Sequence, residues 1–129
     1  MDPQDLVIST QNLGNVLAAI ALSPGVRDHI LQRTRQYIRS GYRLLEHWID
    51  QHPDLFSLTP PQATAVSFVR YYRTINSTQL VHKFIDKDTF VVPGDVFGFD
   101  HYLRISFGLP EDYLREGLNR LAEVTAAAA

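Results

Sequence analysis

The sequence of 129 residues contains no cysteine, which excludes a disulfide framework and a thiolate metal site. It also lacks an excess of charge, because 12 Lys and Arg against 14 Asp and Glu leave a net charge of −2. Such a balance gives no general attraction for nucleic acid or an acidic membrane surface. The most apolar stretch, Val16–Leu22, is far too short to span a bilayer. The first five residues do not resemble a secretory signal, so we expect a cytoplasmic protein that binds neither nucleic acid nor membrane.

Lysine is scarce as well, since Lys83 and Lys87 are the only two in the sequence. Both fall in or just beyond a predicted amphipathic helix, and no glycine-rich phosphate-binding segment is present. The sequence therefore offers little support for chemistry that depends on an activated lysine beside a bound phosphate group.

What the sequence does contain is the pattern of one domain, residues 1–129, which is long enough to bury a core. Apolar spacing and Pro or Gly stops predict helices and strands in the order α-α-β-β-α-β-β-α. The helices are expected at about residues 13–22 and 26–52, from the N-cap Ser77 and from Pro110; the strands at 55–59, 65–71, 89–92 and 102–107. This order predicts an α+β fold, with a small mixed or antiparallel sheet and helices mainly on one face.

The first predicted helix, residues 13–22, is apolar almost all round. A helix without a polar face is stable in water only when other groups cover it. We therefore expect either burial against another domain or self-association of the chain through this helix.

Asp95, Asp100 and His101 lie together in the loop before the last strand, and His82 and Asp86 are spaced i, i+4 on a helix. Carboxylates and histidine can form a metal site or an acid–base pair. For the loop group we favour turn capping and loop solvation, and the helical pair has no third ligand. We therefore expect no metal site.

Two segments near the end of the chain resemble a known family. Val91–Gly98 reads VVPGDVFG, and Tyr102–Phe107 reads YLRISF. This pair is similar to the closing signature of class I/II aminotransferases, which depend on pyridoxal phosphate. The order of the remaining elements from about Ile8 to Val124 agrees with the C-terminal small domain of that family.

The resemblance implies a role for Arg104. Strand alternation places Leu103 and Ile105 on one face and Arg104 on the other, so the arginine faces away from the core. A guanidinium group can grip a carboxylate through two parallel hydrogen bonds. By resemblance, Arg104 binds the α-carboxylate of an amino-acid or 2-oxo-acid substrate; without the motif, a surface arginine paired with Asp100 or another acid is the alternative.

This sequence also departs from the family pattern in two places. The family often has a glycine pair where this sequence has Gln62–Thr64, which weakens the expectation of a substrate contact there. The family's catalytic lysine, which forms a Schiff base with pyridoxal phosphate, has no counterpart in the settings of Lys83 and Lys87. We therefore expect the isolated chain to be inactive, and a large domain to supply the lysine and the cofactor site in the parent enzyme.

The sequence leaves a second function open, namely a free-standing module that binds a carboxylate ligand or a protein without catalysis. It also leaves open the amino donor, the 2-oxo acid, and whether the parent is a transaminase or a lyase or cyclase on the same scaffold.

Overall fold

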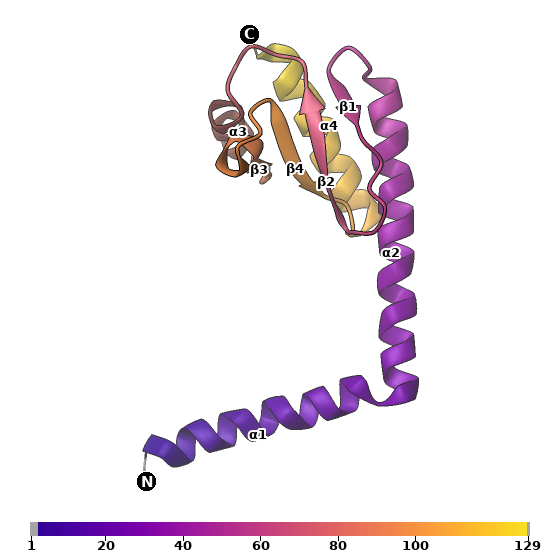
Figure 1. The fold of residues 1–129 in the computed structure, drawn as a ribbon, viewed down its shortest axis with the longest axis vertical. Helices are drawn as coiled ribbons and strands as arrows, with labels where there is room; N and C mark the ends of the chain where they lie inside the picture. Colours follow the sequence, from indigo (N-terminus) through magenta and orange to yellow (C-terminus); the bar gives the residue numbers. More distant parts are fainter. Residues whose placement is uncertain (1–2, 129) are drawn as a thin grey trace. The chain divides into compact units, whose positions relative to one another are not determined.

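The computed structural model describes residues 3–128, with the side chains of residues 12–128. It contains four α-helices, one short 3-10 helix and four strands (Figure 1). In chain order these are α1 (Pro3–Leu22), α2 (Pro24–Gln51), β1 (Phe56–Leu58), β2 (Val66–Tyr71), α3 (Ser77–Ile85), β3 (Val92–Pro93), η1 (Gly94–Phe97), β4 (Tyr102–Ser106) and α4 (Glu111–Ala127).

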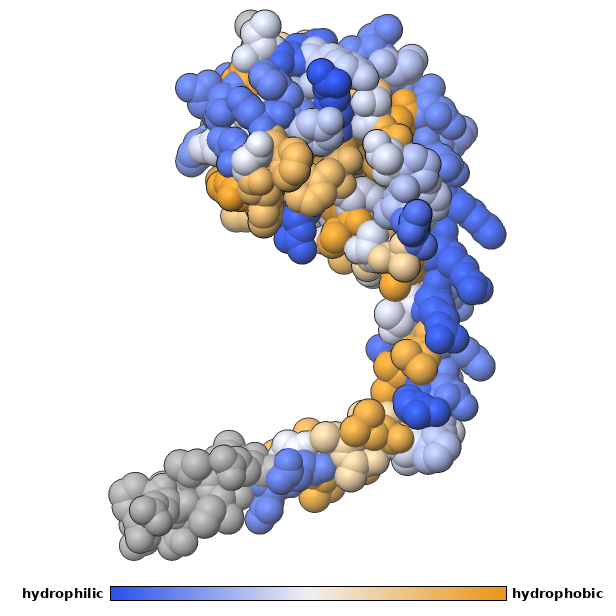
Figure 2. All heavy atoms as spheres, in the orientation of Figure 1, coloured by the Kyte–Doolittle hydropathy of each residue, from blue (hydrophilic) through white to orange (hydrophobic). Residues whose placement is uncertain are grey.

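The chain divides into two compact units between residues 36 and 37, within α2. The first unit holds α1 and the start of α2. Its apolar side chains Leu13, Val16, Leu17 and Ile20 are each more than half exposed, and Figure 2 shows hydrophobic residues at the surface of α1. Large apolar side chains of the first predicted helix are thus exposed within this unit.

The helix α1 starts at Pro3, ten residues before the predicted start at Leu13. The earlier residues include Ser9, Thr10 and Asn12, which are weak helix formers and give no apolar stripe. Proline at the first helical position has a preset φ, and each residue added to an existing helix gains a hydrogen bond. Propagation from the apolar half explains a helix that periodicity does not indicate.

The second unit contains the predicted α+β architecture. Its sheet is antiparallel throughout, in the order β1-β2-β4-β3. Val69 of β2 and Leu103 of β4 are paired and fully buried, and they pack with Leu45, Leu80 and Leu118 from α2, α3 and α4. These helices therefore cover one face of the sheet, and α4 passes behind β2 and β4 in Figure 1. The fold class predicted from the sequence is confirmed.

The predicted strand at residues 89–92 is reduced to Val92–Pro93, and a 3-10 helix that was not predicted follows it at once. Asp88 has a φ of 52°, and the backbone N–H of Thr89 donates to Phe84 at the end of α3. The chain is still completing the turn out of α3 at Thr89, so its high β propensity is overridden there by tertiary structure.

The N-cap of α3 lies one residue before the position predicted from the sequence. Asn76, not Ser77, is the N-cap, because its Oδ1 accepts hydrogen bonds from the backbone of Thr78 at 2.9 Å and Gln79 at 3.4 Å. Both residue types cap helices well. The Ser77 hydroxyl instead accepts from the backbone N–H of Asp95 at 3.1 Å.

Candidate functional site

Arg104 lies in the middle of β4, between the buried residues Leu103 and Ile105. Its side chain is half-buried on the opposite face, which confirms the predicted alternation. In the sheet register Arg104 is paired with Phe68 of β2 on one side and with Val92 of β3 on the other. A central strand therefore fixes the backbone of this arginine from both sides.

We call this side of the sheet the outer face and define it by Phe68, Arg70, Tyr102 and Arg104. Over residues 12–128, whose side chains the structure describes, the side chain of Arg104 makes neither an ion pair nor a hydrogen bond. The surface pair with Asp100 that the sequence left open is not formed. The hydrogen-bond donors of the guanidinium are thus not used by any described residue.

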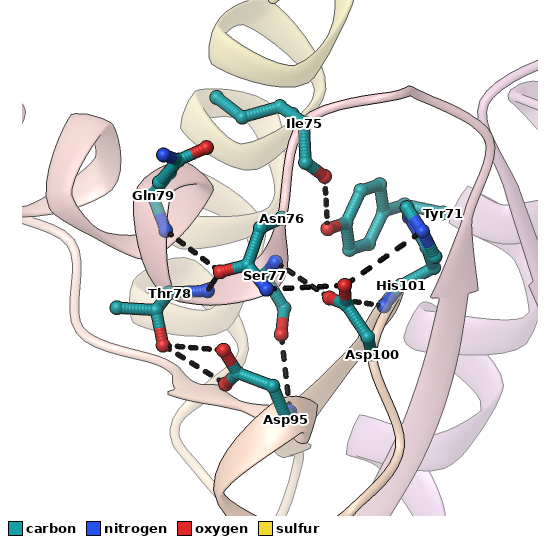
Figure 3. Close-up of polar contacts among 9 residues, drawn as sticks. All are labelled: Tyr71, Ile75, Asn76, Ser77, Thr78, Gln79, Asp95, Asp100 and His101. Carbon is teal, nitrogen blue, oxygen red and sulfur yellow. Dashed lines mark hydrogen bonds and ion pairs between the residues drawn. The ribbon is translucent and has the colours of Figure 1, made fainter.

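Asp100 is instead bound to the start of α3, as Figure 3 shows. Its carboxylate accepts hydrogen bonds from the Ser77 backbone N–H at 2.8 Å, from Asn76 Nδ2 at 3.0 Å and from its neighbour His101 N at 2.8 Å. These donors, the Ser77 N–H first, lower the pKa of Asp100 to about 2. Asp100 is therefore ionised at neutral pH and joins the loop before β4 to α3.

Asp95 of η1 is also hydrogen-bonded to the first turn of α3 (Figure 3). The Thr78 hydroxyl donates to both carboxylate oxygens, at 2.9 and 2.7 Å, and this contact lowers the pKa of Asp95 below its usual value. The capping expected for the two aspartates is therefore present, but their hydrogen bonds to α3 were not predicted, since loop solvation was expected instead. In the part of the chain with described side chains, no three of the His, Asp and Glu residues are placed to hold a metal, and His82 and Asp86 are exposed on α3.

His101 has a structural contact of its own. Its φ of 64° is in the left-handed region, and its carbonyl accepts a hydrogen bond from the backbone N–H of Tyr71 at 3.0 Å. Its ring lies 5.6 Å from the buried ring of Tyr71, whose hydroxyl donates to Ile75 O at 2.6 Å. Burial raises the pKa of Tyr71. This phenol is therefore neutral at physiological pH, and it anchors the turn that leads into α3.

The glycines of the VVPGDVFG segment are required by the backbone. A Cβ atom on Gly94 would lie 2.2 Å from Phe99 O and 2.7 Å from Tyr102 O, and Gly98 has a φ of 80°. The segment can thus fold tightly over the edge of the sheet only with glycine at these two positions.

The sequence analysis did not single out the aromatic residues beside Arg104. The ring centroid of Phe68 lies 5.6 Å from that of Phe97 and 6.2 Å from that of Phe99. The ring centroids of Phe99 and Tyr102 are 6.3 Å apart. We call these four residues the aromatic cluster. The spacing of Phe97 and Phe99 indicates no strand or helix face, and their contact with Phe68 depends on the fold of the Gly94–Gly98 segment. The signal available in the sequence was the density of aromatics near Arg104.

The loop before β2 departs from the family pattern in its structure too. Where a glycine pair is often found, the Thr64 hydroxyl accepts a hydrogen bond from Val66 N at 3.1 Å. The exposed residues Gln62 and Ala63 precede it. A turn closed by the side chain of Thr64 therefore precedes β2, where the family often has a glycine pair.

The fold and the motif around Arg104 are those of aminotransferases, and the comparisons agree. The chain matches the family "Aminotransferase class I and II" over residues 4–121, and it belongs to this family. No curated protein sequence matches it.

Several solved structures share the fold. A PLP-dependent aminotransferase from Streptococcus suis is 25% identical, with a TM-score of 0.80 over 88% of this chain and 30% of that one. The PLP-dependent cyclase OrfR is 26% identical, with a TM-score of 0.68 over 81% and 29%. The α-aminoadipate aminotransferase of Thermus thermophilus is 22% identical, with a TM-score of 0.73 over 86% and 30%. The chain thus spans less than a third of the length of these relatives.

The residues present do not fit a covalently bound pyridoxal phosphate. Lys83 lies in the last turn of α3 and Lys87 just after it, and both are exposed. They line a shallow hollow with Asp86, Glu123 and the end of α4, which offers no group placed to bind a phosphate. Arg104 is on the outer face of the sheet, away from both lysines in the chain order of elements. Over residues 3–128, the structure contains no helix with the length and apolarity needed to cross a membrane.

Proposed function

We propose that this chain is the small domain of a pyridoxal-phosphate-dependent aminotransferase that moves an amino group between an amino acid and a 2-oxo acid. Membership of the class I and II family supports the proposal. The observation that carries it is the position of Arg104, which β2 and β3 hold from both sides and which has no ion pair among the described side chains.

The task of Arg104 in this proposal is to bind and orient the α-carboxylate of the substrate. A planar guanidinium can donate two parallel hydrogen bonds to a carboxylate, and this fixes the direction of the bound group as well as its position. Because β2 and β3 hold the strand from both sides, the backbone of Arg104 needs no rearrangement when the substrate binds, and only the side chain has to be ordered. Correct placement of the α-carbon is one source of catalytic rate.

The chemistry at the α-carbon belongs to a part of the parent enzyme outside this chain. Lys83 and Lys87 are in surroundings that do not suit a bound cofactor. A separate large domain would supply the lysine and the cofactor site, and the small domain would close over the substrate and exclude water. The chain by itself is therefore inactive under this proposal.

A free-standing carboxylate-binding or protein-binding module is the second candidate. It is favoured by the unsuitable surroundings of both lysines and by the exposed apolar surface of α1. A reading frame upstream of this sequence that encodes the lysine-bearing half of an aminotransferase would exclude this second candidate.

The test is Arg104→Ala in the full-length enzyme. Loss of a charged bidentate contact costs roughly 2–4 kcal/mol in kcat/KM. Arg115→Ala is the matched control, because Arg115 is paired with Glu111 at 2.6 Å on α4, in the helical layer. Near-normal turnover of amino acids by the Arg104→Ala enzyme would refute the assignment.

A further inference from the structure

The aromatic cluster and Arg104 share one face of the sheet. Phe68 is the register partner of Arg104 across β2 and β4, and Tyr102 precedes Arg104 by two residues on the same face. Residues opposite each other on neighbouring strands have Cβ atoms roughly 4.5–5.5 Å apart. An anion held by Arg104 therefore lies within side-chain reach of an aromatic ring.

The rings of the cluster are joined to each other and still accessible. Phe97 contacts Phe68 edge to face, with an angle of 86° between the ring planes. Phe68, Phe97 and Phe99 remain 37%, 49% and 60% exposed, and Figure 2 shows hydrophobic side chains gathered near β3 and β4. These rings therefore keep area for a further apolar group.

The loop that carries Phe97 and Phe99 is held in place before any ligand binds. Asp95 and Asp100 join it to the first turn of α3 through Thr78 and Ser77 (Figure 3). The close approach of Gly94 to Phe99 O fixes the loop from the other side. A preformed apolar surface loses less entropy on binding than a mobile one.

The second arginine on the outer face is oriented toward another strand. The guanidinium of Arg70 lies over the ring of Tyr72, 5.5 Å from its centroid, and the Tyr72 hydroxyl donates to Ser57 of β1 at 2.8 Å. Arg104 is on β4, on the opposite side of β2. Arg70 is thus engaged by Tyr72, whereas Arg104 shares its part of the outer face with Phe68 and Tyr102.

We propose that the aromatic cluster is the side-chain subsite of the enzyme and that it selects amino acids and 2-oxo acids with a large apolar, above all aromatic, side chain. This inference rests on the proposed function, because it takes Arg104 as the site of the α-carboxylate. It adds the class of substrate, which the carboxylate contact by itself does not define. Stacking or edge contact with the cluster supplies the discrimination.

The experiment uses the full 129-residue chain and three stable carboxylates: 3-phenylpropanoate, propanoate and glutarate. Each is titrated into isotope-labelled protein at a protein concentration at which the chain is monomeric, while the NMR signals of the Arg104 Nε–H and the aromatic rings are followed. We expect 3-phenylpropanoate to bind about three- to tenfold more tightly than propanoate, since one aromatic pair has roughly that effect. Glutarate is expected to bind no more tightly than propanoate.

Two variants test whether the aromatic cluster causes the difference in affinity between 3-phenylpropanoate and propanoate. Phe97→Ala with Phe99→Ala should remove the preference for 3-phenylpropanoate and leave the binding of propanoate unchanged; unchanged amide signals of Leu103 and Ile105 verify the fold. Tyr113→Ala removes a ring of α4 that is more exposed than that of Phe97 or Phe99, at 70%, and should change neither affinity.

The outcomes separate the two proposals. Equal affinities for all three carboxylates, or a preference for glutarate, would overturn the aromatic subsite and leave Arg104 as a carboxylate site. If no carboxylate shifts the Arg104 signal, the proposed role of Arg104 fails, and the subsite fails with it.

Discussion

Gly41 of α2 lies directly against the backbone of Phe107, just after β4. A Cβ atom at position 41 would be 1.7 Å from the Phe107 carbonyl oxygen. The ring of Phe107 in turn meets Tyr42 at 5.7 Å in an edge arrangement. This close approach sets the position of α2 on the strand that carries Arg104.

The first prediction follows from this contact. Gly41→Ala should lower the free energy of unfolding by about 3 kcal/mol, the upper end of overpacking costs, because two backbones must separate to admit a methyl group. Gly117→Ala is the matched control, since nothing lies within 4 Å of the added Cβ in α4. It should raise the free energy of unfolding by about 0.5–1 kcal/mol through helix propensity. Urea unfolding of both variants tests this, and equal stabilities would contradict it.

The sequence predicted most of this fold because the patterns were local. Arg104 could be placed on the outer face from the alternation Leu103, Arg104, Ile105 alone, and the α+β order followed from periodicity and from Pro or Gly stops. The remaining features depend on contacts that no local pattern contains. Thr89 is held by the turn out of α3, and Phe97 meets Phe68 only after η1 has formed.

The second prediction concerns acid stability. The folded-state pKa of Asp100, about 2, is lower than the unfolded value of about 4. Its contribution to stability is therefore complete above pH ~4 and is lost as the pH falls through about 2. Since Asp100 is 40% exposed, solvent screening reduces this contribution to on the order of 1 kcal/mol.

The variant Asp100→Asn tests the linkage. It should be less stable than the parent chain at neutral pH, and the difference should shrink as the pH falls from about 4 to about 2. Asp50→Asn, a change at an exposed position of α2, is the control. A stability difference for Asp100→Asn that is constant with pH would show that its carboxylate is not the source.

The third prediction separates binding from folding at Arg104. Arg104→Ala should change the free energy of unfolding by less than about 0.5 kcal/mol, because the side chain has no partner among the described residues and faces away from the core. Arg104→Lys should fold equally well but should not restore turnover in the full-length enzyme, since the two-pronged guanidinium is lost. Full activity of the lysine variant would show that charge alone suffices there.

The fourth prediction concerns the cofactor. Borohydride reduction of the chain mixed with pyridoxal phosphate should not fix the cofactor on one lysine at near-stoichiometric yield. Lys83 and Lys87 are both exposed and lie near acidic residues, so neither provides a specific site. Absorbance and peptide mapping after reduction measure the yield at each position. Stoichiometric labelling of either lysine would contradict the inactivity proposed for the isolated chain.

The last prediction concerns the surface of α1. Leu13, Val16, Leu17 and Ile20 are 64%, 56%, 58% and 53% exposed, and contiguous apolar patches beyond a few hundred Å² favour association. Covering such a patch returns roughly 25 cal/mol per Å², which amounts to several kcal/mol before the costs of association. The isolated chain should therefore form dimers or larger species as its concentration rises, and it should bind a hydrophobic dye.

Light scattering across a wide concentration range measures this association, and a paired substitution tests its cause. Leu17→Gln with Ile20→Gln should move association to higher concentration and weaken dye binding, because two of the exposed apolar side chains become polar. Leu22→Gln is the comparison, since Leu22 is even more exposed, at 68%, but is the last residue of the helix, and it should have the smaller effect. A monomer at every concentration without a dye signal would mean that the chain covers α1 itself. That result would favour the free-standing module over the enzyme domain. A helix surface that a large domain covers in the parent enzyme would not also be covered by the chain itself.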